Sequence, residues 1–264
     1  FLTRLQEARL QQGLESANAR ILSEAVPRSP SSPRTSTNAL LGLIDGLVIG
    51  SALVMLRELR FAGFRTSDDI TRFANVNVMA TLPELKVRGR QRVLAYLREK
   101  PNSVFSEAVR NLRTSILMND MEHDPKVILV TSSIPAEGKT PLSISLSQFF
   151  GTLEDKRVLL VEADVRRQTL KEYVQHSIDS GAPNLIDLML GRVTLEEASL
   201  FNEELGIEVL MGASEKINAA DLFESRRFAE LLERLREIYD FIIIDSPPVL
   251  AVPDARVLSR YADA

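Results

Sequence analysis

A ten-residue run from Thr131 to Thr140 has the residue types of a phosphate-binding loop: Thr-Ser-Ser-Ile-Pro-Ala-Glu-Gly-Lys-Thr. It follows an apolar run at 127–131 and precedes a segment of helical spacing that ends near residue 153. Between a strand and a helix, the backbone N–H groups of such a loop face phosphate oxygens, and the helix N-terminus favours negative charge. We expect Lys139 to neutralise the β and γ phosphates and the Thr140 hydroxyl to bind Mg²⁺. The run therefore predicts a nucleoside triphosphate site.

The loop departs from the common pattern at two positions. Ser133 stands where a phosphate loop usually has its first glycine, and Pro141 has no N–H to offer to the α-phosphate. Gly138 permits close approach of the backbone to the ligand. The residues expected to line the bound nucleotide are Ser133, Pro135, Ala136, Glu137, Gly138, Lys139, Thr140 and Pro141.

Acidic residues follow two further apolar runs. Glu162 and Asp164 come just after the run at 158–161, and Asp245 follows the run at 241–244. Ligands of open α/β sheets bind beyond the carboxyl ends of the strands. Carboxylates that meet there can hold Mg²⁺ directly or through water, whereas each acid alone could equally be a solvated strand end. The metal ligands expected beside the loop are Thr140, Asp164 and Asp245.

Short apolar runs alternate with segments of helical period in the second half of the chain. The runs lie at 127–131, 158–161, 207–211 and 241–244. Of the segments between them, Thr194–Glu197 is a capping-box pattern and Arg226–Ile238 carries an apolar stripe. This alternation predicts a parallel sheet covered on both faces. The expected fold class is therefore α/β, a P-loop NTPase-like parallel sheet flanked by helices.

The composition narrows the classes of function. The chain has 264 residues, of which 45% are hydrophobic and 26% charged, so it can bury a sizeable core and is not intrinsically disordered. The absence of cysteine excludes disulfides, thiolate zinc sites and cysteine nucleophiles. The net charge of −4 argues against nucleic acid as a partner.

A long apolar segment precedes the nucleotide motifs. Residues 39–56 carry one charge, Asp45, and as a helix they would span roughly 27 Å, close to the ~30 Å of a bilayer core. Arg57 and Arg60 follow the segment, as in a cytoplasmic flank. The alternative is a buried core helix of a soluble domain, which Asp45 favours because a carboxylate inside a membrane is costly. We interpret the segment as a transmembrane helix.

These features divide the chain into four regions. Residues 1–38 begin with a helical pattern and end in a Pro-rich linker, and residues 39–59 form the transmembrane helix. Residues 60–90 form a juxtamembrane linker, in which a helix is expected to start at Thr66. Residues 91–264 form the nucleotide-binding domain, which opens with two helical stretches separated at Pro101.

Three stretches resemble the nucleotide motifs of bacterial protein-tyrosine kinases, the BY-kinase family: SSIPAEGKT at 132–140, LLVEADVRR at 159–167 and YDFIIIDSPPVL at 239–250. Glu107, Arg110 and Arg113 are similar to the E-x-x-R-x-x-R oligomerisation motif of that family. The Pro-rich run and the apolar helix resemble the last periplasmic segment and the second membrane helix of a polysaccharide co-polymerase. These kinases are the cytoplasmic domains of such co-polymerases, which govern the chain length of exopolysaccharide and capsule.

The resemblance implies an ATP-dependent tyrosine autokinase in the bacterial inner membrane, with its kinase domain in the cytoplasm. Lys139 and Thr140 would grip MgATP, and Asp164 and Asp245 would hold the metal. Glu162, where the family usually has Asp, would approach the acceptor hydroxyl as general base or as a metal-linked helper. A further residue, Arg166, would stabilise phosphate charge.

The resemblance also implies partners. The subunits would form a ring through Glu107, Arg110 and Arg113, and would phosphorylate the C-terminal tyrosine tail of a neighbouring subunit. That tail is expected beyond Ala264. The polysaccharide polymerase and the export proteins would be further partners.

Three other functions remain open on the sequence. An ATP-binding, non-phosphorylating regulatory module of the export machinery is favoured by Glu162 and Pro141. A partitioning or septum-positioning ATPase is disfavoured because those proteins carry a lysine where this chain has Ile134. A purely structural ruler of polymer length would not need ATP.

Overall fold

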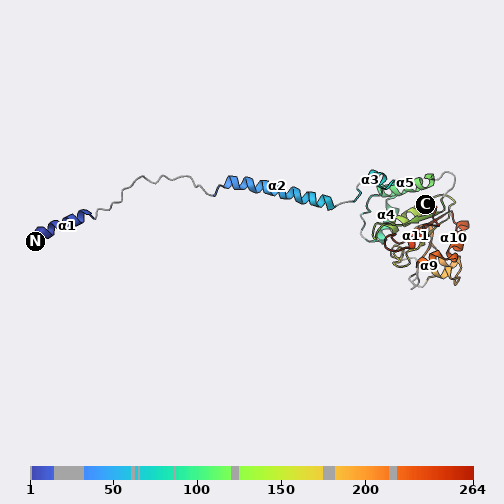
Figure 1. Ribbon diagram of the computed structural model, residues 1–264. Helices are drawn as coiled ribbons and strands as arrows, with labels where there is room; N and C mark the ends of the chain where they lie inside the picture. Colours follow the sequence, from blue (N-terminus) through green and yellow to red (C-terminus); the bar gives the residue numbers. More distant parts are fainter. Residues whose placement is uncertain are drawn as a thin grey trace. The chain divides into compact units, whose positions relative to one another are not determined.

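The computed structural model describes residues 2–14, 33–60, 63–64, 66–85, 87, 89–119, 125–174, 182–213 and 219–264. The chain divides into two compact units, Phe1–Arg65 and Thr66–Ala264. Figure 1 shows the helices and strands coloured by residue number. The predicted Pro-rich linker, apart from its last proline, lies outside the described residues.

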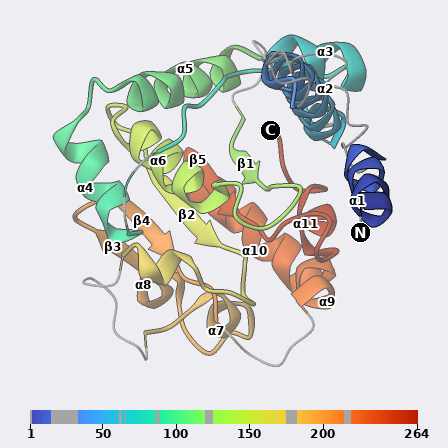
Figure 2. The same ribbon diagram turned by 90° about the vertical axis from the view of Figure 1, so that its left-hand side faces the viewer.

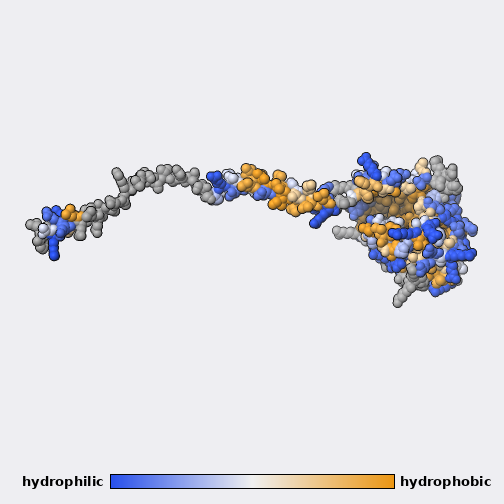
Figure 3. Space-filling model, in the orientation of Figure 1, coloured by the Kyte–Doolittle hydropathy of each residue, from blue (hydrophilic) through white to orange (hydrophobic). Residues whose placement is uncertain are grey.

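The described residues of the first unit form two helices, α1 (Leu2–Leu14) and α2 (Thr35–Arg60). α2 is long and apolar enough to cross a membrane, and it has no buried residue. Figure 3 shows hydrophobic side chains along this helix. It begins about a turn before the predicted transmembrane helix at 39–59 and ends one residue after it.

The second unit is built on a five-stranded sheet of β1 (Val127–Val130), β2 (Val158–Glu162), β3 (Ser199–Asn202), β4 (Ile207–Leu210) and β5 (Phe241–Asp245). The strand order is β1-β5-β2-β4-β3. The four predicted strands are confirmed, and they run parallel to one another. β3 was not predicted: it lies at the edge of the sheet, antiparallel to β4, and is only partly buried.

Helices cover both faces of the sheet. α4 (Gln91–Glu99), α5 (Val104–Asn119) and α6 (Lys139–Gly151) pack on one face. α7 (Leu185–Met189), α9 (Ala219–Glu224), α10 (Arg226–Ile238) and α11 (Asp254–Leu258) pack on the other. Figure 2 shows the sheet between these two layers. Alternate strand residues serve the two cores: Leu160 and Ile243 face the α6 layer, whereas Leu159 and Ile242 face the α10 layer.

Local sequence explains where several helices begin. Thr66 caps α3 (Ser67–Ala74) in a capping box with Asp69, as expected for a helix that starts there. Thr194 and Glu197 form the predicted capping box of α8 (Leu195–Ala198). α4 and α5 are separate helices on either side of Pro101, because the proline ring disfavours a continuous helix. A short 3₁₀ helix, η1 (Leu170–Glu172), follows β2.

Candidate functional site

The predicted phosphate loop connects β1 to α6 at the carboxyl edge of the sheet. Gly138 precedes the first residue of α6 and has φ +90°, a conformation that glycine adopts without cost. Ala136 also has a positive φ, +70°, although it carries a Cβ. The loop therefore has the tight, strained backbone that a phosphate cradle requires.

Lys139 lies in the first turn of α6 and points at two acids. Its Nζ lies 3.0 Å from Oδ2 of Asp164 and 3.9 Å from Oδ1 of Asp245. Both carboxylates are almost fully buried, with 1% and 0% of their side-chain surfaces exposed. Three residues predicted for one site are thus brought together at the ends of β2 and β5.

Asp245 is the centre of this group. Its carboxylate accepts hydrogen bonds from the Thr140 hydroxyl at 2.8 Å and from the Ser143 hydroxyl at 3.0 Å. Burial raises the pKa of Asp245, and the positive charge of Lys139 together with the two hydroxyl donors opposes that rise. Ser143 was missed from the sequence, although it lies on the same side of α6 as Lys139, one turn further along.

The donor set fits Mg²⁺, which prefers oxygen ligands and is usually held by one or two carboxylates together with substrate phosphates. Thr140, Asp164 and Asp245 supply a hydroxyl and two carboxylates within one cluster. Among the residues that the structure describes, no three acidic or histidine side chains gather closely enough to hold a metal ion by themselves. The remaining ligands would have to come from nucleotide and water.

Glu162 lies beside this cluster but faces other partners. It is the last residue of β2 rather than the first after it, and it is fully buried. Its Oε1 accepts the N–H of Leu170 at 2.7 Å, and its Oε2 accepts the N–H of Gly212 at 3.2 Å. Burial raises the pKa of Glu162 to about 7 against these two backbone donors. Each carboxylate oxygen thus accepts one backbone N–H, and the role of Glu162 toward an acceptor hydroxyl stays a prediction.

Arg166 contacts an acid of α11, and its predicted role toward phosphate stays a prediction. Its Nε donates to Oδ2 of Asp254 at 3.2 Å, and Asp254 is fully buried while its other oxygen, Oδ1, has no hydrogen-bond partner. The arginine therefore neutralises a buried acid at the start of α11. Its neighbour Arg167 instead lines the phosphate side of the loop.

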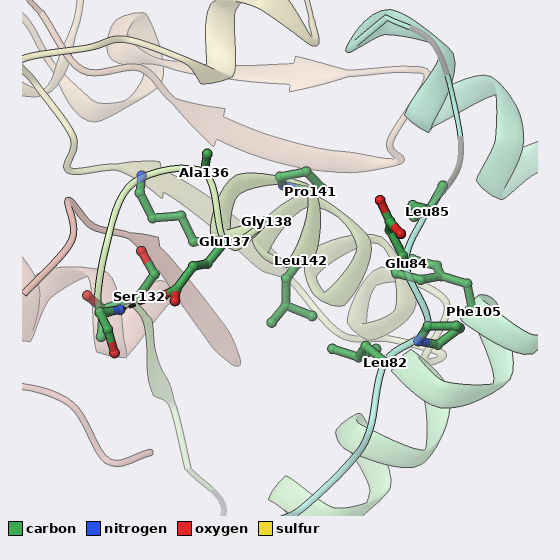
Figure 4. Close-up of a pocket in the computed structure, with 14 residues that line it drawn as sticks. Leu82, Glu84, Leu85, Phe105, Ser132, Ala136, Glu137, Gly138, Pro141 and Leu142 are labelled. Carbon is green, nitrogen blue, oxygen red and sulfur yellow. Dashed lines mark hydrogen bonds between the residues drawn. The ribbon is translucent and has the colours of Figure 1, made fainter. Parts of the chain in front are cut away.

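Two cavities border the loop. The smaller, about 290 Å³, is lined by loop residues, by Lys139 and Asp164, and by Arg90, Arg167, Thr169 and Tyr173. The larger, about 710 Å³, lies between the loop and the segment Leu82–Leu85, with Phe105 at its side (Figure 4). Arg90 and Leu82–Leu85 were not predicted here, because no sequence pattern reveals that the juxtamembrane linker returns to the nucleotide loop.

The predicted oligomerisation residues make contacts within the chain. Arg110 forms an ion pair with Glu107, and its guanidinium lies 5.4 Å from the ring centroid of Phe149 in α6. Arg113 donates from Nη1 to the carbonyl oxygen of Phe149 at 2.6 Å. Both arginines therefore hold α5 against the C-terminal end of α6.

Comparison with known proteins identifies the family of the chain. A family model described as an AAA domain matches residues 125–261. Tyrosine-protein kinase ptk of Acinetobacter johnsonii is 30% identical over 99% of this chain, and the match covers 36% of ptk. Succinoglycan biosynthesis transport protein ExoP of Rhizobium meliloti is 25% identical over the whole chain, and the match covers 37% of ExoP. The chain thus spans little more than a third of the length of these relatives.

A solved structure, the kinase domain of the Escherichia coli tyrosine kinase ETK, matches with a TM-score of 0.67 and 27% identity. The match covers 76% of this chain and 80% of that one. Because the family model covers more than half of the sequence and includes β1, the phosphate loop and β5, the chain belongs to the AAA-domain family of P-loop proteins, and within it resembles the bacterial tyrosine-protein kinases.

Proposed function

We propose that residues 66–264 form the ATP-dependent tyrosine kinase domain of an inner-membrane polysaccharide co-polymerase. One observation carries the proposal: Lys139, Thr140, Asp164 and Asp245 converge at the N-terminus of α6, beneath a loop with the backbone of a phosphate cradle. Homology to named tyrosine-protein kinases supports the reaction type.

The chain's own residues would perform phosphoryl transfer mainly by positioning and charge neutralisation. Loop amides and Lys139 would hold the β and γ phosphates in line with the acceptor tyrosine oxygen. Thr140, Asp164 and Asp245 would hold Mg²⁺, which when bound neutralises charge on the phosphate oxygens. The ammonium of Lys139 contacts Asp164 in this structure. When nucleotide binds, the same ammonium would contact both Asp164 and the phosphates.

The proton of the tyrosine hydroxyl needs an acceptor as the new P–O bond forms and the bond to the ADP oxygen breaks. Asp164 is the acid that lines the smaller cavity, whereas Glu162 is held by two backbone amides. We therefore assign the acceptor role to a water that Asp164 orients while it holds the metal, and a supporting role to Glu162. The larger cavity has the size expected for the nucleoside part of ATP.

The proposal also includes an anchor in the membrane and partner proteins. α2 would anchor the chain in the inner membrane, and the kinase unit would lie on the cytoplasmic side, at the end of the helix whose last turn carries Arg57 and Arg60. The relative ExoP, named for succinoglycan biosynthesis transport, supports a role beside polysaccharide polymerase and export proteins. Ring assembly through α5 and phosphorylation of a neighbour's tyrosine tail complete the proposal.

A second function deserves a test because of Glu162 and Pro141. Both carboxylate oxygens of Glu162 accept a backbone N–H, and Pro141 offers no N–H in the first turn of α6. Both features would suit a module that binds ATP and regulates assembly without transferring phosphate.

Phosphotyrosine formation separates the two functions. The full chain in lipid nanodiscs is incubated with labelled MgATP and a tyrosine-containing peptide, and phosphotyrosine is measured. We expect label on tyrosine that depends on Lys139. Saturable ATP binding with no phosphotyrosine would favour the regulatory module, and absence of both would reject the nucleotide site.

A further inference from the structure

Glu137 turns its side chain back into the phosphate loop. One carboxylate oxygen, Oε2, accepts the N–H of Ser133 at 2.8 Å and the N–H of Ile134 at 3.2 Å. Figure 4 shows this carboxylate beside Ser132, at the beginning of the loop. The glutamate therefore connects the end of the loop to its start.

The carbonyl groups in the same stretch are also satisfied. The carbonyl of Ser132 accepts the N–H of Val249 at 2.9 Å, and that of Ser133 accepts the N–H of Leu250 at 3.3 Å. The carbonyl of Ile134 accepts the Ser132 hydroxyl at 2.9 Å. The backbone groups of residues 132–134 are thus largely hydrogen-bonded, and Glu137 supplies the acceptor for two of their N–H groups.

A negative charge at this position needs a reason, because the loop is built to receive phosphate. By Coulomb repulsion alone, Glu137 should weaken the binding of a nucleotide. Ala136, next to it, has φ +70°, and an alanine in that region costs roughly 1–2 kcal/mol. A loop with this backbone needs a contact that holds it in shape before ligand arrives.

We propose that Glu137 is a positioning residue. Its carboxylate accepts the N–H groups of Ser133 and Ile134 and so holds the phosphate loop in the shape that binds nucleotide. The effect on the loop is independent of ligand, whereas the effect on affinity rests on the proposed function. The two hydrogen bonds of Glu137 favour nucleotide binding by more than the repulsion between its carboxylate and the phosphates opposes it. In the alternative, the carboxylate occupies the phosphate site and must be displaced by the ligand. Removing the carboxylate would weaken MgATP binding in the first case and strengthen it in the second.

The affinity test uses the full chain in lipid nanodiscs and isothermal titration with MgATP. For Glu137→Ala we expect the dissociation constant to rise about tenfold, about 1.4 kcal/mol, although a negative charge has been removed. Glu137→Gln keeps an oxygen acceptor at the same reach and should stay within about threefold of the native chain. Glu203→Ala, in the exposed turn between β3 and β4, is the control for loss of a charge and should leave affinity unchanged.

Hydrogen exchange gives a readout without nucleotide. In the ligand-free Glu137→Ala chain, the peptide covering residues 131–138 should exchange faster than in the native chain, and the thermal midpoint should change little because Glu137 is exposed. Equal or tighter MgATP binding by Glu137→Ala would overturn the proposal, as would unchanged exchange of that peptide. If the native chain bound no MgATP, the proposed function would fail, and exchange alone would decide whether the two hydrogen bonds of Glu137 hold the loop.

Discussion

Two acids occupy equivalent places at the ends of neighbouring strands, and their surroundings differ. Glu162 and Asp245 are partners in the register of β2 and β5, and both are fully buried. Asp245 faces the hydroxyls of Thr140 and Ser143, at the start of α6. Glu162 faces the backbone amides of the loops after β2 and β4.

This comparison shows that place in the sheet does not decide the role of an acid. α6 begins over β5, so Asp245 meets side chains that can bind ligand and metal. At the end of β2, Glu162 instead accepts the N–H groups of Leu170 and Gly212, amides that would otherwise be buried without partners. A Cβ at position 212 would lie 2.8 Å from the carbonyl oxygen of Glu162, so Gly212 permits this close approach.

Substituting each acid by its amide should separate the roles most strongly. Asp245→Asn should lower the rate of phosphotyrosine formation by about a thousandfold, because it removes charge where the metal is expected. Glu162→Gln should lower it by less than about fivefold, provided that the fold is retained. Initial rates at saturating MgATP, with circular dichroism as control, test both. An equal loss in Glu162→Gln would restore the catalytic role expected from the sequence.

The pH dependence of stability should depend on Glu162. Its pKa in the folded chain is about 7 rather than the ordinary 4.5, so the folded state holds this proton more tightly than the unfolded state. The resulting stabilisation is fully present below about pH 4.5 and is lost as the pH rises through 7. Between those limits the free energy of unfolding should fall by about 3 kcal/mol more in the native chain than in Glu162→Gln. The measurement is urea unfolding at several pH values. An equal change of the free energy of unfolding with pH in the two chains would contradict this prediction.

The neighbouring arginines extend the comparison. Arg167→Ala should raise the KM for ATP about tenfold, because this side chain lines the smaller cavity. Arg166→Ala should change that KM less than about twofold but lower the thermal midpoint, since it leaves the buried Asp254 without its cation. Steady-state kinetics and thermal unfolding of both variants are the measurements. A larger rise in the KM for ATP in Arg166→Ala than in Arg167→Ala would instead assign phosphate binding to Arg166.

The smallest effect is expected in α5. Arg113→Ala should destabilise the second unit by about 1 kcal/mol, because it loses the hydrogen bond to the end of α6. The double variant Glu107→Ala with Arg110→Ala should disperse oligomers if α5 is also the subunit interface. Size-exclusion chromatography with light scattering reports the second effect. Unchanged assemblies would leave α5 as an intramolecular support only.

Much of the framework could be predicted because it depends on local patterns. The four parallel strands are continuous apolar runs, and the phosphate loop has a recognisable spacing before α6. Convergence of Lys139 with Asp164 and Asp245 follows from parallel topology, since the ends of β2 and β5 must meet beside the loop.

The remaining features depend on contacts between distant segments. The edge strand β3 is short and half exposed, so its pattern resembles a loop. The direction of the Glu162 carboxylate depends on where the N–H groups of Leu170 and Gly212 lie, which spacing does not reveal. Arg90 reaches the smaller cavity only through the path of the linker, and Arg166 turns away because Asp254 is buried nearby.

Binding of MgATP to a lysine variant tests the central claim most directly. Isothermal titration compares the native chain, Lys139→Met and Lys156→Met, in which a surface lysine paired with Asp240 is replaced as control. We predict one saturable site in the native chain and in Lys156→Met. In Lys139→Met we predict no measurable binding, with a folded domain by circular dichroism. Retained affinity in folded Lys139→Met would contradict the assignment of this cluster as the nucleotide site.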